Sequence, residues 1–435
     1  MKTSADAVVV GAGVIGASVA LELARSGLSV VVVDKAGAAG HGSTSASSAI
    51  VRFNYSTRDG VATSWESKHC WARWAEHLDH VDDYGLACFH RTGMVVLDAP
   101  TAANDRIAAL LDDVGVPNER WDPATLRERL PFADAGRYWP PKAVDDDAFF
   151  AGPTGELGAL FMPDAGFVSD PQLAAHNLLA AAQHRGARTI FNRAVAAVHR
   201  DGDRTTGVRL SDGTDVSAGV VVNAAGPWSG QLNRLAGVGA DFTIRVRPLR
   251  QEVHRVRAPA GYAEGGALGP AIADLDLGTY VRPDTVGGLL VGGTEPACDP
   301  LEWIDDPDAS NPNATAPRFA AQVTRAARRL VGLGVPPSPA GAAGVYDVAD
   351  DWTPIYDRTS LGGYYVAMGT SGNQFKNAPL AGRFIATLVS AVESGHDHDS
   401  APVRYHCEHT GHEINLGSFS RLRPFNAQSS GTVMG

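Results

Sequence analysis

Residues 7–34 decide the fold of this chain, and they read AVVVGAGVIGASVALELARSGLSVVVVD. Residues 7–10 form a short run without charge, as expected of a strand that is buried on both faces. A turn with glycines at positions 11, 13 and 16 follows, and residues 17–26 then predict a helix that ends at Gly27. Residues 28–33 predict a second buried strand, which Asp34 closes. The predicted order is strand, glycine turn, helix, strand and acid.

This order is typical of a dinucleotide-binding unit. Gly11 permits the tight turn, and Gly13 lets the backbone approach a pyrophosphate that sits on the helix N-terminus. Gly16 allows the helix and the strand to pack closely. Asp34 stands where a carboxylate accepts hydrogen bonds from the ribose hydroxyls of an adenosine and repels a 2′-phosphate. The sequence therefore predicts a dinucleotide other than NADP, and this motif alone does not separate FAD from NAD.

Composition narrows the class of protein. A length of 435 residues favours two domains, and 44% hydrophobic with 20% charged residues is ordinary for a globular protein. The net charge of −11 gives no reason to expect nucleic acid or an anionic membrane as a partner. Glu22 and Arg25 interrupt the apolar N-terminal region before it is long enough to span a membrane. We expect a cytoplasmic protein without a membrane segment.

Cysteines and histidines give no metal prediction. The four cysteines show no CxxC spacing, so neither a disulfide framework nor a zinc site is indicated. Five histidines follow Gly395, but nothing sets a tetrahedral ligand spacing among them. We interpret residues 396–435 as a surface tail and expect no metal.

The rest of the chain alternates helical and strand-like patterns. Residues 37–48 form a loop of small residues, and we expect its N–H groups and hydroxyls to line the cofactor site as hydrogen-bond donors. Asp170 and Pro171 mark a clear helix start, and Asp212-Gly213 marks a hairpin. From residue 245 to 294, successive strands indicate an antiparallel sheet of a second domain. Predicted helices cover residues 63–78, 101–111, 171–185, 319–330 and 379–390, and predicted strands cover residues 93–97, 219–222, 251–257, 279–282, 288–292 and 363–368.

Four segments together resemble one family. They are residues 11–34, 42–45 (GSTS), 223–228 (NAAGPW) and 369–376 (GTSGNQFK). Their order and spacing resemble the FAD-dependent D-amino acid oxidase/sarcosine oxidase superfamily, and most closely its sarcosine and dimethylglycine oxidase branch. The resemblance implies FAD rather than NAD. It also implies an α/β fold, in which a Rossmann-like FAD-binding domain of the glutathione-reductase type carries an inserted, mostly antiparallel α+β substrate domain.

The resemblance also implies domain boundaries and cofactor contacts. The FAD-binding domain is expected at residues 1–86, 160–229 and 342–395, and the substrate-binding domain at residues 87–159 and 230–341. The residues expected to contact FAD are Gly11, Gly13, Val14, Ile15, Gly16, Asp34, Lys35, Gly42, Ser43, Thr44, Ser45, Ser48, Val195, Ala225, Gly226, Trp228, Gly344, Gly372, Asn373, Gln374, Phe375 and Lys376.

The implied reaction is oxidation of the C–N bond of a carboxylate-bearing amine, sarcosine-like or otherwise N-substituted. A hydride equivalent moves to flavin N5, and water hydrolyses the resulting imine. Arg52 and Lys376 match an arginine and a lysine that clamp the substrate carboxylate in related enzymes, which is physically coherent because both form charge-assisted bonds. Tyr280 and Tyr346 fall where aromatic residues line the substrate cavity. No residue stands out as a general base, and hydride transfer from a neutral amine does not require one.

Departures from the family pattern carry further expectations. Covalent members attach flavin through a histidine or a cysteine, but this chain has residues 44–48 and Gly344 at those places, so we expect noncovalent FAD. Leu290 aligns with a lysine that helps related oxidases activate oxygen. Without that cation, slow reaction with oxygen is expected, so a dehydrogenase that uses another electron acceptor is an alternative to an oxidase that uses O2. The alternatives are oxidation of glycine, a D-amino acid or a cyclic imino acid, a flavin subunit that needs partner chains, and an NAD-dependent dehydrogenase without flavin.

Overall fold

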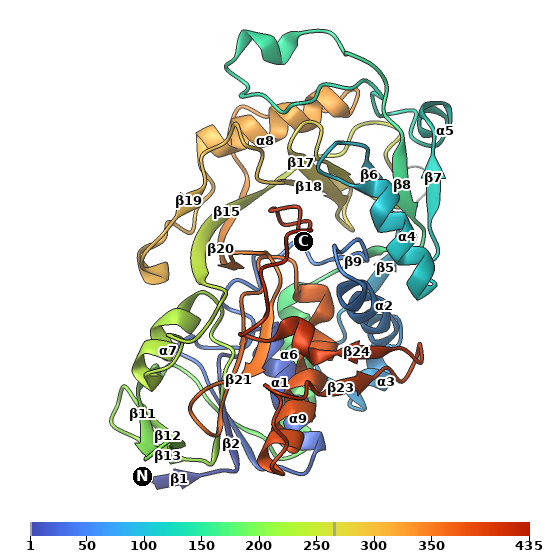
Figure 1. Cartoon of the computed structure of the whole chain (residues 1–435). Helices are drawn as coiled ribbons and strands as arrows, with labels where there is room; N and C mark the ends of the chain where they lie inside the picture. Colours follow the sequence, from blue (N-terminus) through green and yellow to red (C-terminus); the bar gives the residue numbers. More distant parts are fainter. Residues whose placement is uncertain (1, 264–266) are drawn as a thin grey trace.

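The computed structural model describes residues 2–263 and 267–435, and its lower half in Figure 1 is built on a six-stranded sheet. Five neighbouring strands run parallel, and the edge strand β21 is antiparallel to β22. In spatial order the strands are β10 (Arg188–Ile190), β3 (Val30–Val33), β2 (Ala7–Val10), β14 (Val220–Asn223), β22 (Tyr364–Met368) and β21 (Ile355–Arg358).

Both faces of this sheet are buried, which explains its uninterrupted apolar strands. Along β2, Val8 belongs to one hydrophobic cluster and Val9 to another, because successive side chains point to opposite faces. Helices α1 (Val14–Arg25), α6 (Pro171–His184) and α9 (Ala378–Glu393) cover the Val9 face. The Val8 face is covered by α7 (Ser229–Ala236) and by a four-stranded sheet made of β1 (Lys2–Ser4), β13 (Asp215–Ser217), β12 (Arg204–Leu210) and β11 (Val195–Asp201).

The upper half of the molecule in Figure 1 contains a larger, mostly antiparallel sheet. Only the contact between β16 and β6 is parallel among the strand pairs of this sheet in the described residues. Helix α8 (Ala316–Arg329) packs against it through Phe319, Val323 and Ala326. The strands are β19 (Glu302–Trp303), β15 (Val246–Arg257), β18 (Gly288–Gly293), β17 (Thr279–Pro283), β16 (Ala271–Asp274), β6 (Met94–Leu97), β8 (Ala159–Met162) and β7 (Glu119–Trp121), with β20 (Gly341–Ala349) paired to β15.

The predicted α/β fold class is therefore confirmed, and most predicted elements lie where the sequence places them. The helix predicted at residues 63–78 is two helices, because the chain leaves helical geometry at Arg73. Trp71 and Trp74 are buried, as core residues should be. The remaining elements are β4 (Ile50–Val51), α2 (Arg58–Ala72), α3 (Trp74–Leu78), β5 (Phe89–Arg91), α4 (Asn104–Val114), α5 (Pro123–Arg129), β9 (Gly166–Val168), β23 (Arg404–His406) and β24 (Glu413–Asn415), with short 3₁₀ turns η1 (Asp147–Phe150), η2 (Gly226–Trp228), η3 (Pro307–Ala309), η4 (Phe375–Asn377) and η5 (Leu416–Phe419).

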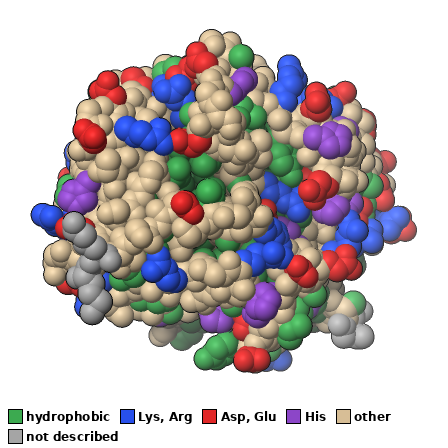
Figure 2. Space-filling view, turned by 90° about the horizontal axis from the view of Figure 1, so that it is seen from below, with side chains coloured by type: hydrophobic (Ala, Val, Ile, Leu, Met, Phe, Trp, Pro, Cys, Tyr) green, Lys and Arg blue, Asp and Glu red, His purple; other side chains and the backbone are tan. Residues whose placement is uncertain are grey.

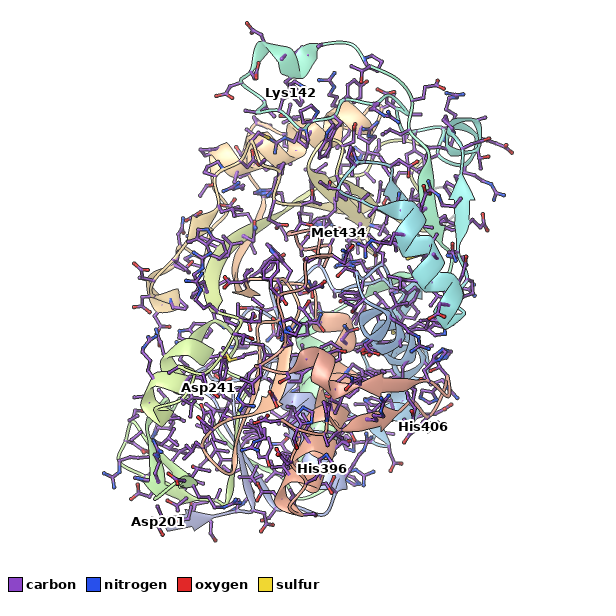
Figure 3. All side chains as sticks on the ribbon, in the orientation of Figure 1. Lys142, Asp201, Asp241, His396, His406 and Met434 are labelled. Atoms are coloured by element: carbon purple, nitrogen blue, oxygen red, sulfur yellow. The ribbon has the colours of Figure 1, made fainter. Side chains whose placement is uncertain are left out.

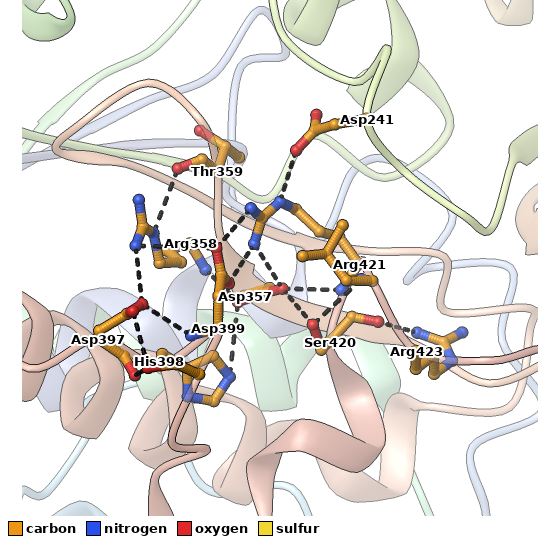
Figure 4. A network of polar contacts seen from close by, with 12 residues as sticks. Asp241, Asp357, Arg358, Thr359, Asp397, His398, Asp399, Ser420, Arg421 and Arg423 are labelled. Carbon is orange, nitrogen blue, oxygen red and sulfur yellow. Dashed lines mark hydrogen bonds and ion pairs between the residues drawn. The ribbon is translucent and has the colours of Figure 1, made fainter.

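The interpretation of residues 396–435 as a surface tail is wrong. This segment forms β23, β24 and η5, and it buries apolar side chains such as Ile414 and Leu416 in the same cluster as helix α9. Figure 4 shows how a charged network holds it: the buried Arg421 side chain pairs with Asp357, Asp399 and Asp241. The sequence pattern was misleading because Arg421 and Arg423 are buried in ion pairs with acidic side chains rather than exposed to solvent.

The surface carries charges of both signs. On the face seen in Figure 2, acidic and basic side chains are mixed rather than gathered by sign. Within residues 2–263 and 267–435, none of the helices combines the length and the apolar character that crossing a membrane requires.

Candidate cofactor and substrate site

A cavity of about 390 Å³ has walls from both large sheets. Val10, Val33 and Ala367 line it at or near the carboxyl ends of β2, β3 and β22, the edge at which open α/β sheets bind their ligands. Tyr280 of β17 and Tyr346 of β20 contribute walls from the antiparallel sheet. The cavity thus joins a nucleotide-type edge to a second, aromatic compartment.

The glycine turn of this cavity is fitted for close backbone contact. A Cβ atom on Gly11 would lie 2.3 Å from the Ala224 carbonyl oxygen, and Gly11 has a φ of +109°, which L side chains rarely adopt. A Cβ atom on Gly16 would lie 1.9 Å from the Gly11 oxygen. Gly13 at the start of helix α1 has no side chain to cap the helix, and the Val14 N–H donates to the Thr44 hydroxyl (3.1 Å). The other N–H groups of the first turn can receive a pyrophosphate. These residues fit a bound dinucleotide.

Asp34 and Lys35 lie beside this turn. The Asp34 carboxylate accepts hydrogen bonds from the N–H groups of Ala12 (2.6 Å) and Ala36 (2.7 Å). Each carboxylate oxygen keeps a free lone pair for a ribose hydroxyl. The Lys35 ammonium lies 3.8 Å from the centre of the Trp228 ring. Residues far apart in the sequence thus meet at the nucleotide end of the cavity.

Nearly all of the predicted site residues line this one cavity. The three that do not are Gly16, Ser45 and Gly344. Gly344 still approaches the cofactor loop, because a Cβ atom there would lie 2.8 Å from the Ala46 Cβ atom. The predicted residues in the cavity wall are Gly11, Gly13, Val14, Ile15, Asp34, Lys35, Gly42, Ser43, Thr44, Ser48, Arg52, Val195, Ala225, Gly226, Trp228, Tyr280, Tyr346, Gly372, Asn373, Gln374, Phe375 and Lys376.

Arg52 is a buried cation in the wall of the cavity, with a side chain that is only 4% exposed. Its guanidinium donates to the Asn54 carbonyl (2.8 Å), the Asn54 side-chain oxygen (3.2 Å) and the Val433 carbonyl (2.6 Å). No carboxylate within the described residues forms an ion pair with it. Burial lowers the pKa of Arg52, because a charged guanidinium that is removed from water loses free energy of solvation that no acidic side chain replaces. An anionic ligand would supply that partner.

Lys376, the second predicted cation, lines the cavity, and its ammonium points to Tyr55. Its ammonium donates to the Tyr55 hydroxyl (2.9 Å) and to the Asn373 carbonyl (2.5 Å). Burial, with the nearby charge of Arg52, lowers the pKa of Lys376 well below its ordinary value. The Tyr55 ring centre lies 5.1 Å from both the Arg52 Cζ atom and the Lys376 Nζ atom. Tyr55 therefore joins the two cations, although the sequence pointed only to the charged residues.

The two predicted tyrosines lie in the substrate end of the cavity. The Tyr280 hydroxyl is 2.6 Å from the Ser48 hydroxyl, which links the antiparallel sheet to the cofactor loop. A Cβ atom on Gly372 would lie 2.3 Å from the Tyr346 ring, so the loop passes this ring only because residue 372 is glycine. Both tyrosines therefore form part of the cavity wall next to loops of the cofactor side.

Three further residues were not found by sequence reasoning. Val433 and Met434 line the cavity, and the Val433 N–H donates to a Glu295 carboxylate oxygen (2.8 Å). Burial raises the pKa of Glu295 to about 8. Its other oxygen accepts from the Gln251 side chain (2.9 Å). No local motif marks Glu295, because its contacts come from a distant strand and from the end of the described chain.

These observations define a protein that holds a dinucleotide cofactor at the edge of a parallel sheet. The profile of the family described as "FAD dependent oxidoreductase" matches residues 6–388, and the chain belongs to this family. FAD is therefore the cofactor, as predicted, and the alternative of an NAD-dependent dehydrogenase without flavin is excluded. Among the described residues, no group of three His, Cys, Asp or Glu side chains is placed to hold a metal ion.

Individual relatives agree with this assignment. The chain is 26% identical over 414 residues to "FAD-dependent oxidoreductase domain-containing protein 1" of Bos taurus, covering 88% of this chain and 81% of the relative. It is 25% identical over 420 residues to "Sarcosine oxidase subunit beta" of Arthrobacter sp, covering 95% and 93%. The fold matches the crystal structure of L-proline dehydrogenase from P. horikoshii with a TM-score of 0.76 and 21% identity, covering 97% and 98% of the two chains.

Proposed function

We propose that this protein oxidises the C–N bond of a carboxylate-bearing amine, with sarcosine-like or other N-substituted amino acids as substrates. The observation that carries the proposal is Arg52, a buried guanidinium in the cavity wall whose partners among the described residues are neutral oxygens. A substrate carboxylate would exchange a neutral acceptor for a charged one. The similarity to a sarcosine oxidase subunit over almost the whole chain supports the same substrate class.

Each part of the cavity has its own role in the proposed reaction. The turn from Gly11 to Gly16 and the N-terminus of α1 hold the pyrophosphate of FAD, and Asp34 binds the ribose. Bound FAD supplies a two-electron acceptor for the hydride equivalent of the amine. Arg52 binds the substrate carboxylate, and Lys376 acts through Tyr55 to fix the position of Arg52. Tyr280 and Tyr346 exclude water around the reacting carbon until the imine leaves and is hydrolysed.

The cofactor is proposed to be noncovalent, because residues 44–48 and Gly344 offer neither a histidine nor a cysteine. The electron acceptor is O2 or another oxidant. Leu290 is not among the residues that line the cavity. Another buried cation lies beside the cofactor loop, because the Arg282 side chain donates to the carbonyl of Ser48 in that loop (2.8 Å).

A second candidate is a flavin subunit that works only with partner chains. The specific observation in its favour is the coverage of 93% of a protein named as a β subunit. An anaerobic titration of the purified chain separates the two. Bleaching of the flavin absorbance by N-methylglycine, another N-substituted amino acid, glycine, a D-amino acid or a cyclic imino acid would establish activity of the single chain and its substrate class. Failure of all of these compounds would favour the subunit.

A further inference from the structure

The last described residues of the chain return to the substrate end of the cavity. Arg423 pairs with Asp351 (2.8 Å), and the Asn426 side chain donates to the Ser56 hydroxyl (2.9 Å). From there residues 427–435, which we call the strap, run between the two large sheets, where Figure 3 labels Met434. Val433 and Met434 are 9% and 6% exposed. The strap is thus anchored at its start and buried at its tip.

The main chain of Val433 contacts two side chains of opposite charge. Its carbonyl oxygen accepts a hydrogen bond from the Arg52 guanidinium (2.6 Å). Its N–H donates to the Glu295 carboxylate (2.8 Å). Val433 therefore satisfies two charged groups through neutral main-chain atoms. One is the Arg52 cation in the cavity wall, and the other is the half-buried Glu295 carboxylate, which is not itself among the residues that line the cavity.

The connectivity of these main-chain atoms is that of an α-amino acid. In Val433, a nitrogen, a single carbon and a carbonyl carbon with its oxygen lie in sequence, as amine, Cα and carboxylate do in a free amino acid. A free amino acid would make both contacts with charged groups, which are stronger than the neutral ones. The spacing of Arg52 and Glu295 fits that arrangement, because one residue already bridges them.

We propose that the strap is an internal pseudosubstrate, and that an α-amino acid displaces Val433 to bind with its carboxylate on Arg52 and its amine on Glu295. This inference rests on the proposed function and deepens it. It names the residue that recognises the amine and restricts the substrate to amines carried by the carbon that bears the carboxylate.

Glu295 has two features that suit this role. Its φ of +49° is in the left-handed region, which a residue other than glycine occupies at a cost, and such strain collects at functional sites. The Gln251 side chain holds its other oxygen, so the direction of the carboxylate is fixed. Burial raises the pKa of Glu295 to about 8, whereas the charge of Arg318 lowers it.

A proton transfer follows from this placement. When ionised Glu295 takes one proton from the substrate ammonium, the carboxylate becomes a carboxylic acid and the amine becomes neutral. The nitrogen then has the free electron pair that oxidation of the C–N bond requires. No other reactant is needed for this step. The tyrosines of this end stay protonated near neutral pH, because burial raises the pKa of Tyr55 and of Tyr280 to about 12 and that of Tyr346 well above its ordinary value. The cations of the same end are Arg52 and Lys376, and burial lowers the pKa of both.

The test compares two probes that differ only at the amine position, N-methylglycine and its ether analogue methoxyacetate. Each is titrated anaerobically into the wild-type holoenzyme, Glu295→Gln and a matched control, Glu128→Gln, which makes the same change at an exposed position of α5. The dissociation constant of methoxyacetate is taken by calorimetry. That of N-methylglycine is taken from the concentration dependence of the rate of flavin reduction after anaerobic rapid mixing. We expect Glu295→Gln to raise the dissociation constant of N-methylglycine about tenfold or more and to leave that of methoxyacetate within about twofold.

A second variant examines the strap. Val433→Pro removes the N–H that Glu295 accepts, whereas Val433→Ala keeps it. We expect Val433→Pro to bind N-methylglycine about threefold or more tightly than wild type, because displacing the strap costs less. Val433→Ala should bind closer to wild type than Val433→Pro does.

The outcomes separate this inference from the proposed function. Equal weakening of both probes in Glu295→Gln, or no weakening of either, overturns the role of Glu295 while the proposed function stands. If Val433→Pro binds N-methylglycine more weakly than wild type, the strap is not a pseudosubstrate. It would then be a part of the site that contacts the substrate. Absence of binding of both probes to wild type overturns the proposed function and this inference together.

Discussion

Replacing Arg52 with methionine tests the proposed carboxylate site most sharply among single substitutions. Methionine approximates the length of the arginine stem but has neither charge nor donors. The guanidinium donates to three neutral oxygens, so no acidic partner among the described residues is left unpaired when the charge is removed. The effect on substrate is then the loss of a charge-assisted bond, about 1.5–3 kcal/mol. We expect the KM of the amino acid to rise about 10- to 150-fold.

The assay is steady-state oxidation of the amino acid that bleaches the flavin, with kcat and KM determined separately. Arg58→Met is the control, because Arg58 is exposed and its one ion pair among the described residues is with Asp113 at the surface. The flavin spectrum of Arg52→Met should stay close to wild type, which separates loss of substrate binding from loss of fold. The melting temperature should fall modestly, because the Asn54 and Val433 carbonyls lose their donor. A KM within about twofold of wild type would remove Arg52 from the substrate site.

Further predictions concern the cofactor and the pH dependence. Gly11→Ala should lose FAD or fail to fold, since its Cβ atom would lie 2.3 Å from the Ala224 carbonyl oxygen; a normal flavin content after purification would contradict this. Acid denaturation should release free flavin, and flavin retained on the polypeptide would show a covalent bond. The KM of the amino acid should fall as the pH rises through about 8, because Glu295 gains its charge there. Glu295→Gln should lose that inflection, and an unchanged profile would assign the titration to another group.

The fold was predictable where it depends on local sequence. The run from residue 7 to 34 contains its own strands, turn, helix and helix stop, and Gly27 ends α1 with a φ of +86°. The hairpin at residues 212–213 and the helix start at Asp170 are likewise local, and the Asp170 side chain caps α6 by accepting from the Leu173 N–H (2.9 Å). Such features can be predicted because neighbouring residues determine them and distant contacts change them little.

The substrate end of the site was only partly predictable. Arg52 and Lys376 were found because each lies in a recognisable motif, but their shared contact with Tyr55 depends on tertiary packing. The contacts of Val433 with Glu295 and Arg52 span 138 and 381 positions in the sequence. No periodicity or spacing carries information over that range, so the strap appeared as a polar tail.

The break between α2 and α3 has a similar explanation. The apolar periodicity runs through Arg73, but the backbone leaves helical geometry at this residue (φ −125°, ψ 48°). The next residue, Trp74, donates a hydrogen bond to the distant Asn177 side chain (3.2 Å), a contact that local sequence does not reveal. Domain boundaries stay a prediction, although the strands of the six-stranded sheet do come from early, middle and late parts of the chain.

The measurement that tests the central claim most directly is a visible spectrum of the purified protein during anaerobic addition of N-methylglycine and related amino acids. We predict a yellow protein whose flavin absorbance is bleached by an N-substituted α-amino acid, and readmitted air or an added oxidant then identifies the acceptor. A yellow protein that is bleached only by amines without a carboxylate would contradict the role of Arg52 and the proposed function.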